Sequence, residues 1–405
     1  MGNSIGTSGP IVVRCGQPAA VAHYFTSKSW IEGSALEQLA ELAKLPGMRS
    51  IAGFPDLHPG KYGPVGMAAL ASRLYPQLIG NDIGCGMALF ELALPQRKFR
   101  IDKAANALRE LENIAFDAPD VAKFAPLFEL GANTEALGTI GGGNHFCEIQ
   151  AVEELFQPDA VELLDRQKLY LLIHTGSRNL GASVFNQTID ENGAMTGGLD
   201  PASKAGARWL ALHGLCVEWA ALNRRMIAQR AALALRTDVR LIADVPHNLV
   251  RTQADGYVHC KGAAAIQSGG IAPIAGSRAS LSYVVEPLDT AAKSHWAISH
   301  GAGRKYDRRN MHGRIGTTRS EREALLRNPW GGITICEDRK LAIEEAAGAY
   351  KNAGQVLEDL VAHGLVRPLA SMKPLITYKK ISVDHEEPKQ ERMRDRKAIR
   401  RRENG

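Results

Sequence analysis

The amino-acid sequence predicts a mixed α/β (α+β) fold, with central β-sheets flanked by helices in one large domain. Three observations lead to this fold class. Several segments carry the helical period of apolar residues, several short β-branched runs are typical of buried strands, and no regular strand–helix rhythm or repeat of about 20–50 residues links them. With 405 residues, of which 45% are hydrophobic and 23% charged, the chain has ample material for a large core.

Four segments of the sequence predict helices. Residues 35–45 and 102–115 each carry apolar side chains at helical spacing. Residues 202–235 form an alanine-rich amphipathic stretch that predicts two or more helices. A further helix is expected over 339–363, ended by Gly364, because glycine commonly follows the last helical residue.

Short apolar runs predict the buried strands, at residues 169–173, 241–245, 282–285 and 375–378. No Pro-rich or Ser-rich linker divides the chain. We therefore expect one domain over residues 1–380, followed by a tail over 381–405.

The tail differs from the rest of the chain in charge. Eight basic and two acidic side chains lie in residues 389–402, a surplus equal to the net charge of +6 of the whole chain. The body is thus neutral and the tail basic. Such a tail fits phosphate-rich partners, and it fits a flexible solubilising end equally well.

The sequence indicates a cytoplasmic protein. Its first residues lack the charged and apolar regions of a secretory signal, and no run of eighteen apolar residues predicts a membrane span. Six cysteines are scattered without a Cys-x-x-Cys pair, which favours reduced thiols over disulfides.

Five glycine-bracketed segments carry the candidate chemistry. In the first, residues 80–87, Asp82 and Cys85 lie three positions apart with glycines on both sides of the thiol. A loop without β-carbons can wrap closely around an ion and point both side chains inward. A tight turn around a buried cysteine is the competing interpretation.

The next three segments contain histidines. Asn144 and His145 end the glycine-rich stretch 141–146, which lacks the Lys-Ser/Thr of a phosphate-binding Walker loop. His174 and His247 each follow a predicted strand, where α/β proteins commonly hold functional side chains. A hydrogen-bonded structural role is the alternative for each histidine alone, but two such arrangements together favour a site.

The fifth segment, residues 298–304, contains His300 followed by Gly-Ala-Gly and Arg304. The small residues leave one face of the imidazole open, and Arg304 is suited to neutralise a phosphate. This suits a nucleophile better than a metal ligand, because in-line attack needs open space at the reacting nitrogen.

The candidate ligands are one carboxylate, one thiolate and three imidazoles. Such a set suits Mn²⁺ or Zn²⁺ and does not suit Ca²⁺. Five ligands exceed one tetrahedral site, which predicts two ions sharing Cys85. Paired metal ions are a common device of phosphoryl chemistry.

In this order, the five segments resemble the RtcB family of GTP-dependent RNA ligases. The resemblance runs from Pro55 to Lys379. It includes residues 55–61, similar to the family's Asp-x-His-x-Gly segment, and residues 259–263, similar to its Arg-Lys-Gly-Ala segment with cysteine replacing arginine. The resemblance implies an RtcB-like catalytic domain over residues 1–380.

The resemblance also implies a ligand set for two Mn²⁺ ions. Asp82, Cys85 and His145 would hold one ion. Cys85, His174 and His247 would hold the other, so that the thiolate is shared.

Further roles are implied for the nucleophile and the nucleotide. GTP would guanylylate His300, and Asp56 would orient its imidazole. The positions that match the family's nucleotide contacts are Asn144, Glu148, Asn248, Ser277, Ser282 and Lys379.

The implied reaction joins RNA ends. An RNA 3′-phosphate, first opened from a 2′,3′-cyclic phosphate, would accept GMP from the histidine, and a 5′-hydroxyl would then displace GMP and seal the strand. This corresponds to RNA repair or to tRNA-splicing-type sealing. Candidate protein partners implied by the family are archease and a release-factor-H-like protein, and no membrane partner is expected.

Two departures from the family pattern leave other functions open. Residues 275–279 read Ala-Gly-Ser-Arg-Ala in place of Pro-Gly-Ser-Met-Gly, and Lys379 is followed by a lysine and the tail in place of a terminal glycine. They suggest a divergent branch, associated in some members with release factor H. One alternative is a dimetal 2′,3′-cyclic phosphodiesterase that processes RNA ends without sealing, and another is a non-catalytic RNA- or ribosome-binding protein that uses the tail.

Overall fold

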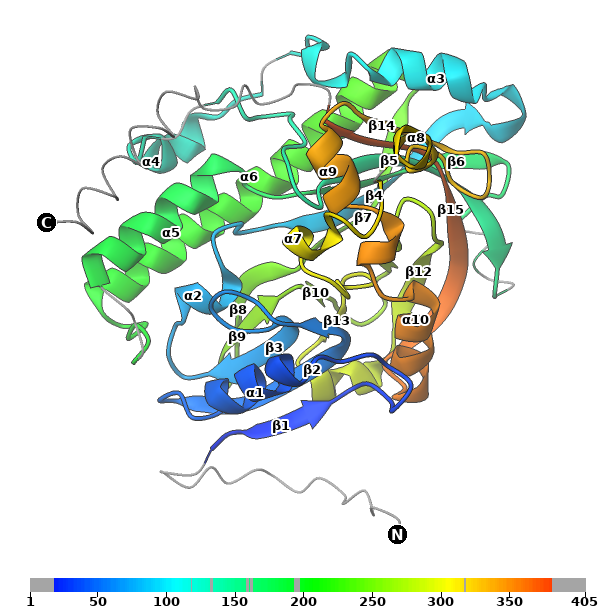
Figure 1. The fold of residues 1–405 in the computed structure, drawn as a ribbon. Coiled ribbons are helices and arrows are strands. Elements are labelled where there is room, and N and C mark those ends of the chain that lie inside the picture. Colours follow the sequence, from blue (N-terminus) through cyan, green and yellow to red (C-terminus); the bar gives the residue numbers. More distant parts are fainter. Residues whose placement is uncertain are drawn as a thin grey trace, which may run out of the picture.

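The computed structural model describes residues 18–117, 119–131, 134–157, 160, 163–192, 197–316 and 318–380. Within these residues, strands and helices mix in one chain, which confirms the predicted α/β class (Figure 1). The basic tail predicted over 381–405 lies outside the described residues. No helix in the described part of the chain combines the length and the apolar character needed to cross a membrane.

The larger sheet has eight strands and forms the centre of the fold. Seven of them lie in the spatial order β11-β12-β15-β5-β6-β4-β7, and β14 pairs with β15 on the side. Their bounds are β4 Gly86–Pro95, β5 Phe146–Leu155, β6 Lys168–Thr175, β7 Val239–Pro246, β11 Ala272–Ile274, β12 Ser282–Pro287, β14 Ile333–Cys336 and β15 Val366–Lys380.

A five-stranded sheet and a two-stranded sheet complete the β-structure. The five-stranded sheet has the order β1-β2-β3-β9-β8, and β10 pairs with β13. Their bounds are β1 Ala20–His23, β2 Met48–His58, β3 Val65–Ala71, β8 Asn248–Gln253, β9 Gly256–Lys261, β10 Ala263–Ala265 and β13 Ala297–Ser299.

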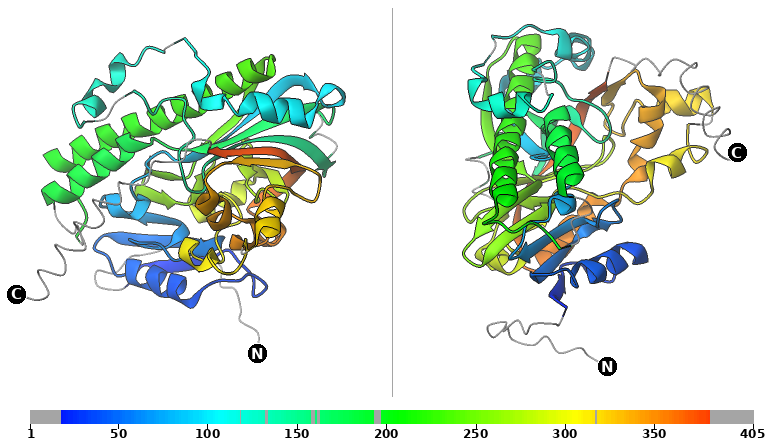
Figure 2. Two further views of the ribbon diagram at one scale, coloured as in Figure 1. Left: turned by 45° about the horizontal axis from the view of Figure 1, so that its top comes forward. Right: turned by 90° about the vertical axis from the view of Figure 1, so that its left-hand side faces the viewer.

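Helices cover the sheets on two sides. The long helix α6 packs on β4, β6 and β7, with α5 beside it. Figure 2 shows α7 to α10 on the opposite side of the larger sheet. The α-helices are α1 Gly33–Leu42, α2 Pro76–Ile79, α3 Ile101–Leu108, α4 Ala125–Phe128, α5 Asn179–Asn192, α6 Lys204–Leu235, α7 Arg308–Met311, α8 Arg319–Ala324, α9 Arg339–Glu344 and α10 Ala353–Ala362. The short 3-10 helices are η1 Gln96–Lys98, η2 Leu111–Asn113, η3 Ala122–Phe124, η5 Asp289–Ser294 and η6 Ala347–Ala349.

A continuous core joins the two larger sheets. Ala52 and Phe54 of β2 belong to the same buried cluster as Ile274 of β11 and Val285 of β12. Because these side chains share one apolar interior, the two sheets hold each other in place. This fixes the position of loops that come from different sheets.

The four predicted strands are present, but two helix predictions are wrong. The stretch 202–235 contains one helix, α6, and not several, because Ser203 caps its first turn, no proline interrupts it and strong helix formers fill it. The predicted helix over 339–363 is divided into α9, η6 and α10. Asn352 caps α10 by accepting a hydrogen bond from Gly354 N, and this starts a new helix where the apolar period alone suggests a continuous one.

The predicted helix over 102–115 is also shorter than expected. Helix α3 ends at Leu108, and the 3-10 turn η2 follows it. The turn keeps the side chain of Leu111 fully buried, so the apolar spacing continues although the α-helix has ended.

Candidate active site

Four neighbouring strands of the larger sheet bring the predicted ligands to one edge. In the order β5-β6-β4-β7 each strand is antiparallel to the next. The starts of β5 and β4 therefore lie beside the ends of β6 and β7. His145 precedes β5, Cys85 precedes β4, His174 lies near the end of β6 and His247 follows β7. The sheet register places all four at the same edge.

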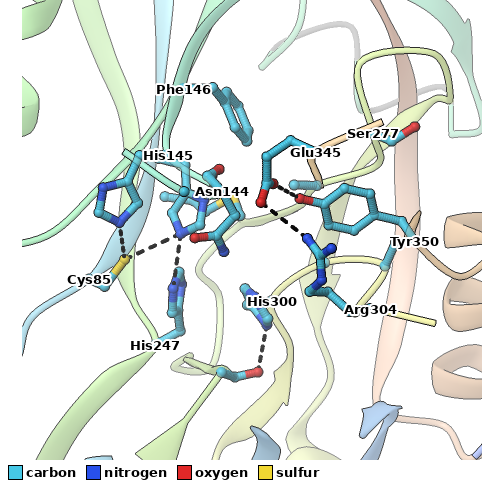
Figure 3. Close-up of a pocket in the computed structure, with 18 of the residues that line it drawn as sticks. Cys85, Asn144, His145, Phe146, His247, Ser277, His300, Arg304, Glu345 and Tyr350 are labelled. Carbon is cyan, nitrogen blue, oxygen red and sulfur yellow. Dashed lines mark hydrogen bonds and ion pairs between the residues drawn. The ribbon is translucent and has the colours of Figure 1, made fainter. Parts of the chain in front are cut away.

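Their side chains meet around the Cys85 thiol (Figure 3). Its sulfur lies 3.2 Å from Nε2 of His174 and 3.4 Å from Nε2 of His145. Nε2 of His174 lies 3.3 Å from Nε2 of His247, and Nε2 of His145 lies 2.9 Å from an Asp82 carboxylate oxygen. The potential ligand atoms form two groups of three that share Cys85 and are compatible with metal binding.

Hydrogen bonds to the backbone orient two of the imidazoles. Nδ1 of His145 donates to Ile140 O at 3.1 Å, and Nδ1 of His174 donates to Asn144 O at 3.2 Å. Each Nδ1 therefore carries a proton, and each Nε2 faces the Cys85 sulfur, which is the orientation of metal-binding histidines. Nδ1 of His247 is buried and has no hydrogen-bond partner among the described atoms.

Burial controls the charge of this cluster. It raises the pKa of the Cys85 thiol well above its usual range, and the charge of Asp82 raises it further. Burial, followed by the neighbouring imidazoles, lowers the pKa of His174 and of His247 well below normal. Burial would raise the pKa of Asp82, but His145 holds it below its normal value. One carboxylate beside three imidazoles and a thiol forms a donor set that fits divalent cations.

Helix α6 holds the loops beneath the cluster. The buried guanidinium of Arg224 binds Asp244 at 2.7 Å and donates from Nη1 to Gly84 O at 2.9 Å and to Thr175 O at 2.8 Å. Gly84 has a positive φ of 75°, and a Cβ there would lie 2.8 Å from the backbone of α6 at Val217. The glycine next to Cys85 thus allows the loop to lie directly on the helix.

His300 reaches the same cavity from the two-stranded sheet. It follows β13, and its Nδ1 lies 2.8 Å from a carboxylate oxygen of Asp56 and 2.6 Å from Gly262 O. Asp56 is fully buried in β2 and also accepts a hydrogen bond from Ser299 Oγ at 2.9 Å. With two acceptors facing Nδ1, the ring carries a proton on that nitrogen.

His300 and the cysteine–histidine cluster are in contact. The ring centres of His300 and His247 are 4.4 Å apart. The side chain of Asn248 joins the two parts, because Nδ2 donates to Asp82 O at 3.3 Å and Oδ1 accepts from Gly262 N at 3.0 Å. The imidazole of His300 therefore lies directly beside a group of potential metal ligands.

The opposite wall of the cavity carries a second polar cluster, centred on Glu345 (Figure 3). Its carboxylate pairs with Arg304 at 3.1 Å and Lys379 at 3.5 Å and accepts a hydrogen bond from the Tyr350 hydroxyl. Burial would raise the pKa of Glu345, but Lys379 and Arg304 lower it to about 2. The carboxylate is thus charged and fixed. Arg304 also donates to Glu344 O and Tyr306 O, so its guanidinium is held by the protein.

Glu148 lies on the cavity wall in a different state. It is buried in β5, where Gln150 Nε2 donates to it at 2.7 Å and the Thr377 hydroxyl donates to its other oxygen. Burial raises its pKa to about 7, although both hydrogen bonds and the charge of Lys379 oppose the rise. Its protonation state therefore changes near neutral pH.

A cavity of about 460 Å³ connects these groups. It has room for a ligand of nucleotide size. The predicted residues that line it are Asp82, Cys85, Asn144, His145, Glu148, His174, His247, Asn248, Ser277, His300, Arg304 and Lys379.

Two predicted residues do not line the cavity. Asp56 lies behind His300. Ser282 lies beneath the turn at 275–279, where its hydroxyl accepts hydrogen bonds from Gly276 N and Gln150 Nε2, both at 3.0 Å. The Ser277 hydroxyl is in the cavity wall and lies 2.9 Å from that of Ser280.

Comparison with known proteins identifies the chain. The sequence model of the family described as "tRNA-splicing ligase RtcB" matches residues 38–122 and 122–380. The chain belongs to the RtcB family. "RNA-splicing ligase RtcB2" of Escherichia coli is 37% identical to it over 357 residues, which are 86% of this chain and 93% of the relative.

More distant RtcB proteins also align over most of the chain. "RNA-splicing ligase RtcB" of Mycobacterium bovis is 26% identical over 433 residues, covering 84% of this chain and 99% of the relative. "RNA-splicing ligase RtcB homolog 1" of Entamoeba dispar is 27% identical over 444 residues, covering 85% of this chain and 82% of the relative. The family resemblance stated from the motifs is thus confirmed.

Several cavity residues of this RtcB protein are not predicted from its sequence. Glu345 and Tyr350 fall in a segment whose period predicts a helix, and only the run of small residues between them hints at a break. Lys261, which donates to Ile79 O at 2.9 Å, and Arg278, whose Nη2 donates to Ala342 O at 2.7 Å, also line the cavity. Arg278 belongs to the segment noted as departing from the family, and this was the available signal.

Proposed function

We propose that the chain is an RNA ligase that joins an RNA 3′-phosphate or 2′,3′-cyclic phosphate to a 5′-hydroxyl with GTP and Mn²⁺. His300 carries GMP as a covalent intermediate. The observation that supports this most directly is the contact between His300, with its proton held on Nδ1 by Asp56, and two ligand groups that share Cys85. Family membership supports the same reaction.

The residues present fit two divalent cations. Asp82, Cys85 and His145 would hold one, and Cys85, His174 and His247 the other. The inward Nε2 atoms of His174 and His247, 3.3 Å apart, favour a cation between their lone pairs. When bound, the ions neutralise phosphate charge and lower the barrier to displacement at phosphorus.

His300 acts as the nucleophile. The Nε2 lone pair forms a bond to the α-phosphorus of GTP while the bond to the bridging oxygen breaks, and pyrophosphate leaves with that electron pair. The imidazole becomes positively charged as the bond forms. The Nδ1–H group donates hydrogen bonds to Asp56 and to Gly262 O. These acceptors stabilise the positive charge without removing the proton.

RNA then receives and releases GMP. Water first opens a cyclic phosphate to the 3′-phosphate. An oxygen of that phosphate attacks the phosphorus bound to His300, which restores the free imidazole and activates the RNA end. The 5′-hydroxyl of the second end attacks the activated RNA phosphate, gives up its proton and displaces GMP, which completes the phosphodiester.

The cavity wall away from the cysteine offers contacts for a guanine base. Glu148 as a carboxylate accepts from the N1–H and amino group of guanine, and Lys379 donates to its O6 oxygen. Asn144 and Ser277 provide further polar contacts to the nucleotide. Arg304, held by Glu345, positions this wall and does not need to reach a phosphate.

The proposal is tested by following both the adduct and the RNA ends. The full chain is incubated with Mn²⁺ and GTP labelled at the α-phosphate, then with RNA ends of defined chemistry. We expect a labelled protein that loses its label in acid, and a joined strand that appears only with GTP. Accumulation of 3′-phosphate without joining, with or without GTP, would indicate the phosphodiesterase function instead. RNA binding without an adduct or any change of the ends would indicate a binding protein.

Replacing Asp56 by asparagine should slow adduct formation while leaving the KM for GTP nearly unchanged. The introduced amide can donate toward Nδ1, which favours the wrong tautomer of His300, and a loss of about 10²- to 10⁴-fold in rate is expected. Single-turnover labelling measures it. The matched variant Ser299→Ala, which removes only the second partner of Asp56, should lose about tenfold or less. An Asp56→Asn rate within about threefold of wild type would contradict the orienting role, since it falls far short of the loss expected from a wrong tautomer.

Glu148 should make GTP binding dependent on pH. Its pKa of about 7 predicts that the KM for GTP rises as the pH falls below 7, because the protonated carboxyl loses an acceptor. Glu148→Gln should raise the KM by about 10- to 100-fold at pH 8 and remove the pH dependence.

Glu148 should also make the stability of the fold depend on pH. Its folded-state pKa lies above the normal 4.5, so ionisation of Glu148 destabilises the fold as pH rises from 4.5 to 7. Urea unfolding at pH 8 should therefore find Glu148→Gln more stable than wild type, and a less stable variant would contradict this.

Other expectations from the sequence stay predictions. These are archease or a release-factor-H-like protein as partner, the cytoplasmic location, and a catalytic domain that spans residues 1–380.

A further inference from the structure

A second groove lies beside the active-site cavity. Its volume is about 480 Å³, and it shares Tyr350 with the cavity. Figure 3 shows that ring on the wall opposite Cys85. We call it the Trp30 groove, and its lining residues are Lys28, Ser29, Trp30, Pro55, Lys305, Tyr350, Lys351, Asn352, Gln355 and Val356.

The Trp30 groove is basic. It contains three lysines, and none of its described lining residues is acidic. Lys351 is engaged by the protein, because its ammonium donates to Pro55 O at 3.1 Å and Leu57 O at 2.6 Å. Lys28 and Lys305 form no ion pair with any described carboxylate, so their ammonium groups are available to an anion.

An exposed aromatic ring lies among these charges. Trp30 is 42% exposed, whereas Trp209 and Trp219 are buried in the core. The ammonium of Lys351 lies 5.9 Å from the centre of the Trp30 ring. Aromatic rings combined with lysines that follow a phosphate backbone are typical of single-strand nucleic-acid sites. An acidic peptide would satisfy the lysines but would not offer flat bases to the indole.

The position of the groove links it to the proposed nucleophile. Lys305 follows Arg304 of the cavity wall, and Pro55 precedes Asp56, the partner of His300. One wall of the groove and the carboxylate that contacts His300 therefore belong to the same short segment. A strand whose end reaches His300 has the Trp30 groove as one adjoining basic surface.

We propose that the Trp30 groove binds a nucleotide of the single-stranded RNA next to the end being joined. The base stacks on Trp30, and Lys28 and Lys305 bind its flanking phosphates. This inference rests on the proposed function, because it assumes that RNA ends enter the cavity.

Equilibrium binding of a fluorescent single-stranded RNA with a 3′-phosphate tests the groove. The full chain is used without GTP, over a series of salt concentrations. Trp30→Ala should weaken binding by about 5- to 100-fold with the salt slope unchanged, and Trp30→Phe should restore most of the loss. Lys28→Ala and Lys305→Ala should each reduce the slope of log K against log salt by about 0.7.

Two controls separate this inference from the proposed function. Lys103→Ala removes the same charge from the exposed face of α3 and should leave the salt slope unchanged. Labelling by GTP needs no RNA, so it reports the proposed function alone. If the Trp30 and lysine variants are labelled normally and bind RNA with unchanged affinity and salt slope, the proposal that the Trp30 groove binds RNA is wrong. If wild type is not labelled, the proposed ligase function is wrong. The binding data then still show whether the Trp30 groove binds RNA.

Discussion

His300→Ala should abolish the GTP-dependent covalent adduct and all joining of RNA ends. The variant keeps the cysteine–histidine cluster but removes the nitrogen proposed to bond to phosphorus, and no described side chain replaces it at that position. We expect a fall of at least about 10⁴-fold in the joining rate, the scale seen when a covalent nucleophile is removed. Mass spectrometry of the GTP-treated chain and a gel assay for the joined strand measure the two effects.

The matched control is His312→Ala. His312 is exposed, pairs with Glu344 at 3.1 Å and does not line the cavity. This variant should form the adduct and join RNA like wild type. An adduct that survives His300→Ala would contradict the assignment of His300. An acid-resistant adduct would also contradict it, because a phosphoramidate is hydrolysed in acid.

Cys85→Ala should have the second largest effect, because the sulfur belongs to both groups of potential ligands. We expect wild type to retain two Mn²⁺ ions per chain and the variant to retain less than one, by elemental analysis after buffer exchange. Adduct formation should fall with the metal. Mn²⁺ at about 100 times its dissociation constant stabilises a fold by about 2.7 kcal/mol, so Mn²⁺ should raise the Tm of wild type and not that of Cys85→Ala.

Cys216→Ala is the control for loss of a buried thiol. Cys216 lies in the core on α6, and burial raises its pKa to about 12. It belongs to neither ligand group. This variant should keep both ions and the Mn²⁺-dependent rise in Tm. Two retained ions in Cys85→Ala would show that the thiol is not the shared ligand.

Much of the candidate site was predictable because its residues lie in short glycine-framed segments at strand ends. The sequence places His174 and His247 after apolar runs, and these runs are the strands β6 and β7. Their convergence on Cys85 depends on the register of β4 with both strands, and spacing along the chain does not determine register. Family resemblance supplied that information.

The Glu345 wall was not predictable by the same reasoning. Its ion pairs with Arg304 and Lys379 form between residues far apart in sequence, and nothing local distinguishes Glu345 from the exposed acidic residues of a surface helix. The break between α9 and α10 was missed for the same reason. Apolar spacing persists across it, while the Asn352 cap and the tertiary contacts of Glu345 decide where the helices end.

The pairing of Asp56 with His300 spans 244 positions of the chain. During synthesis the aspartate leaves the ribosome long before the histidine, and the hydrogen bond that sets the imidazole tautomer forms only when both are present in the finished fold. A polypeptide that ends before position 300 therefore lacks this imidazole, and one without β2 leaves Nδ1 of His300 without its carboxylate partner.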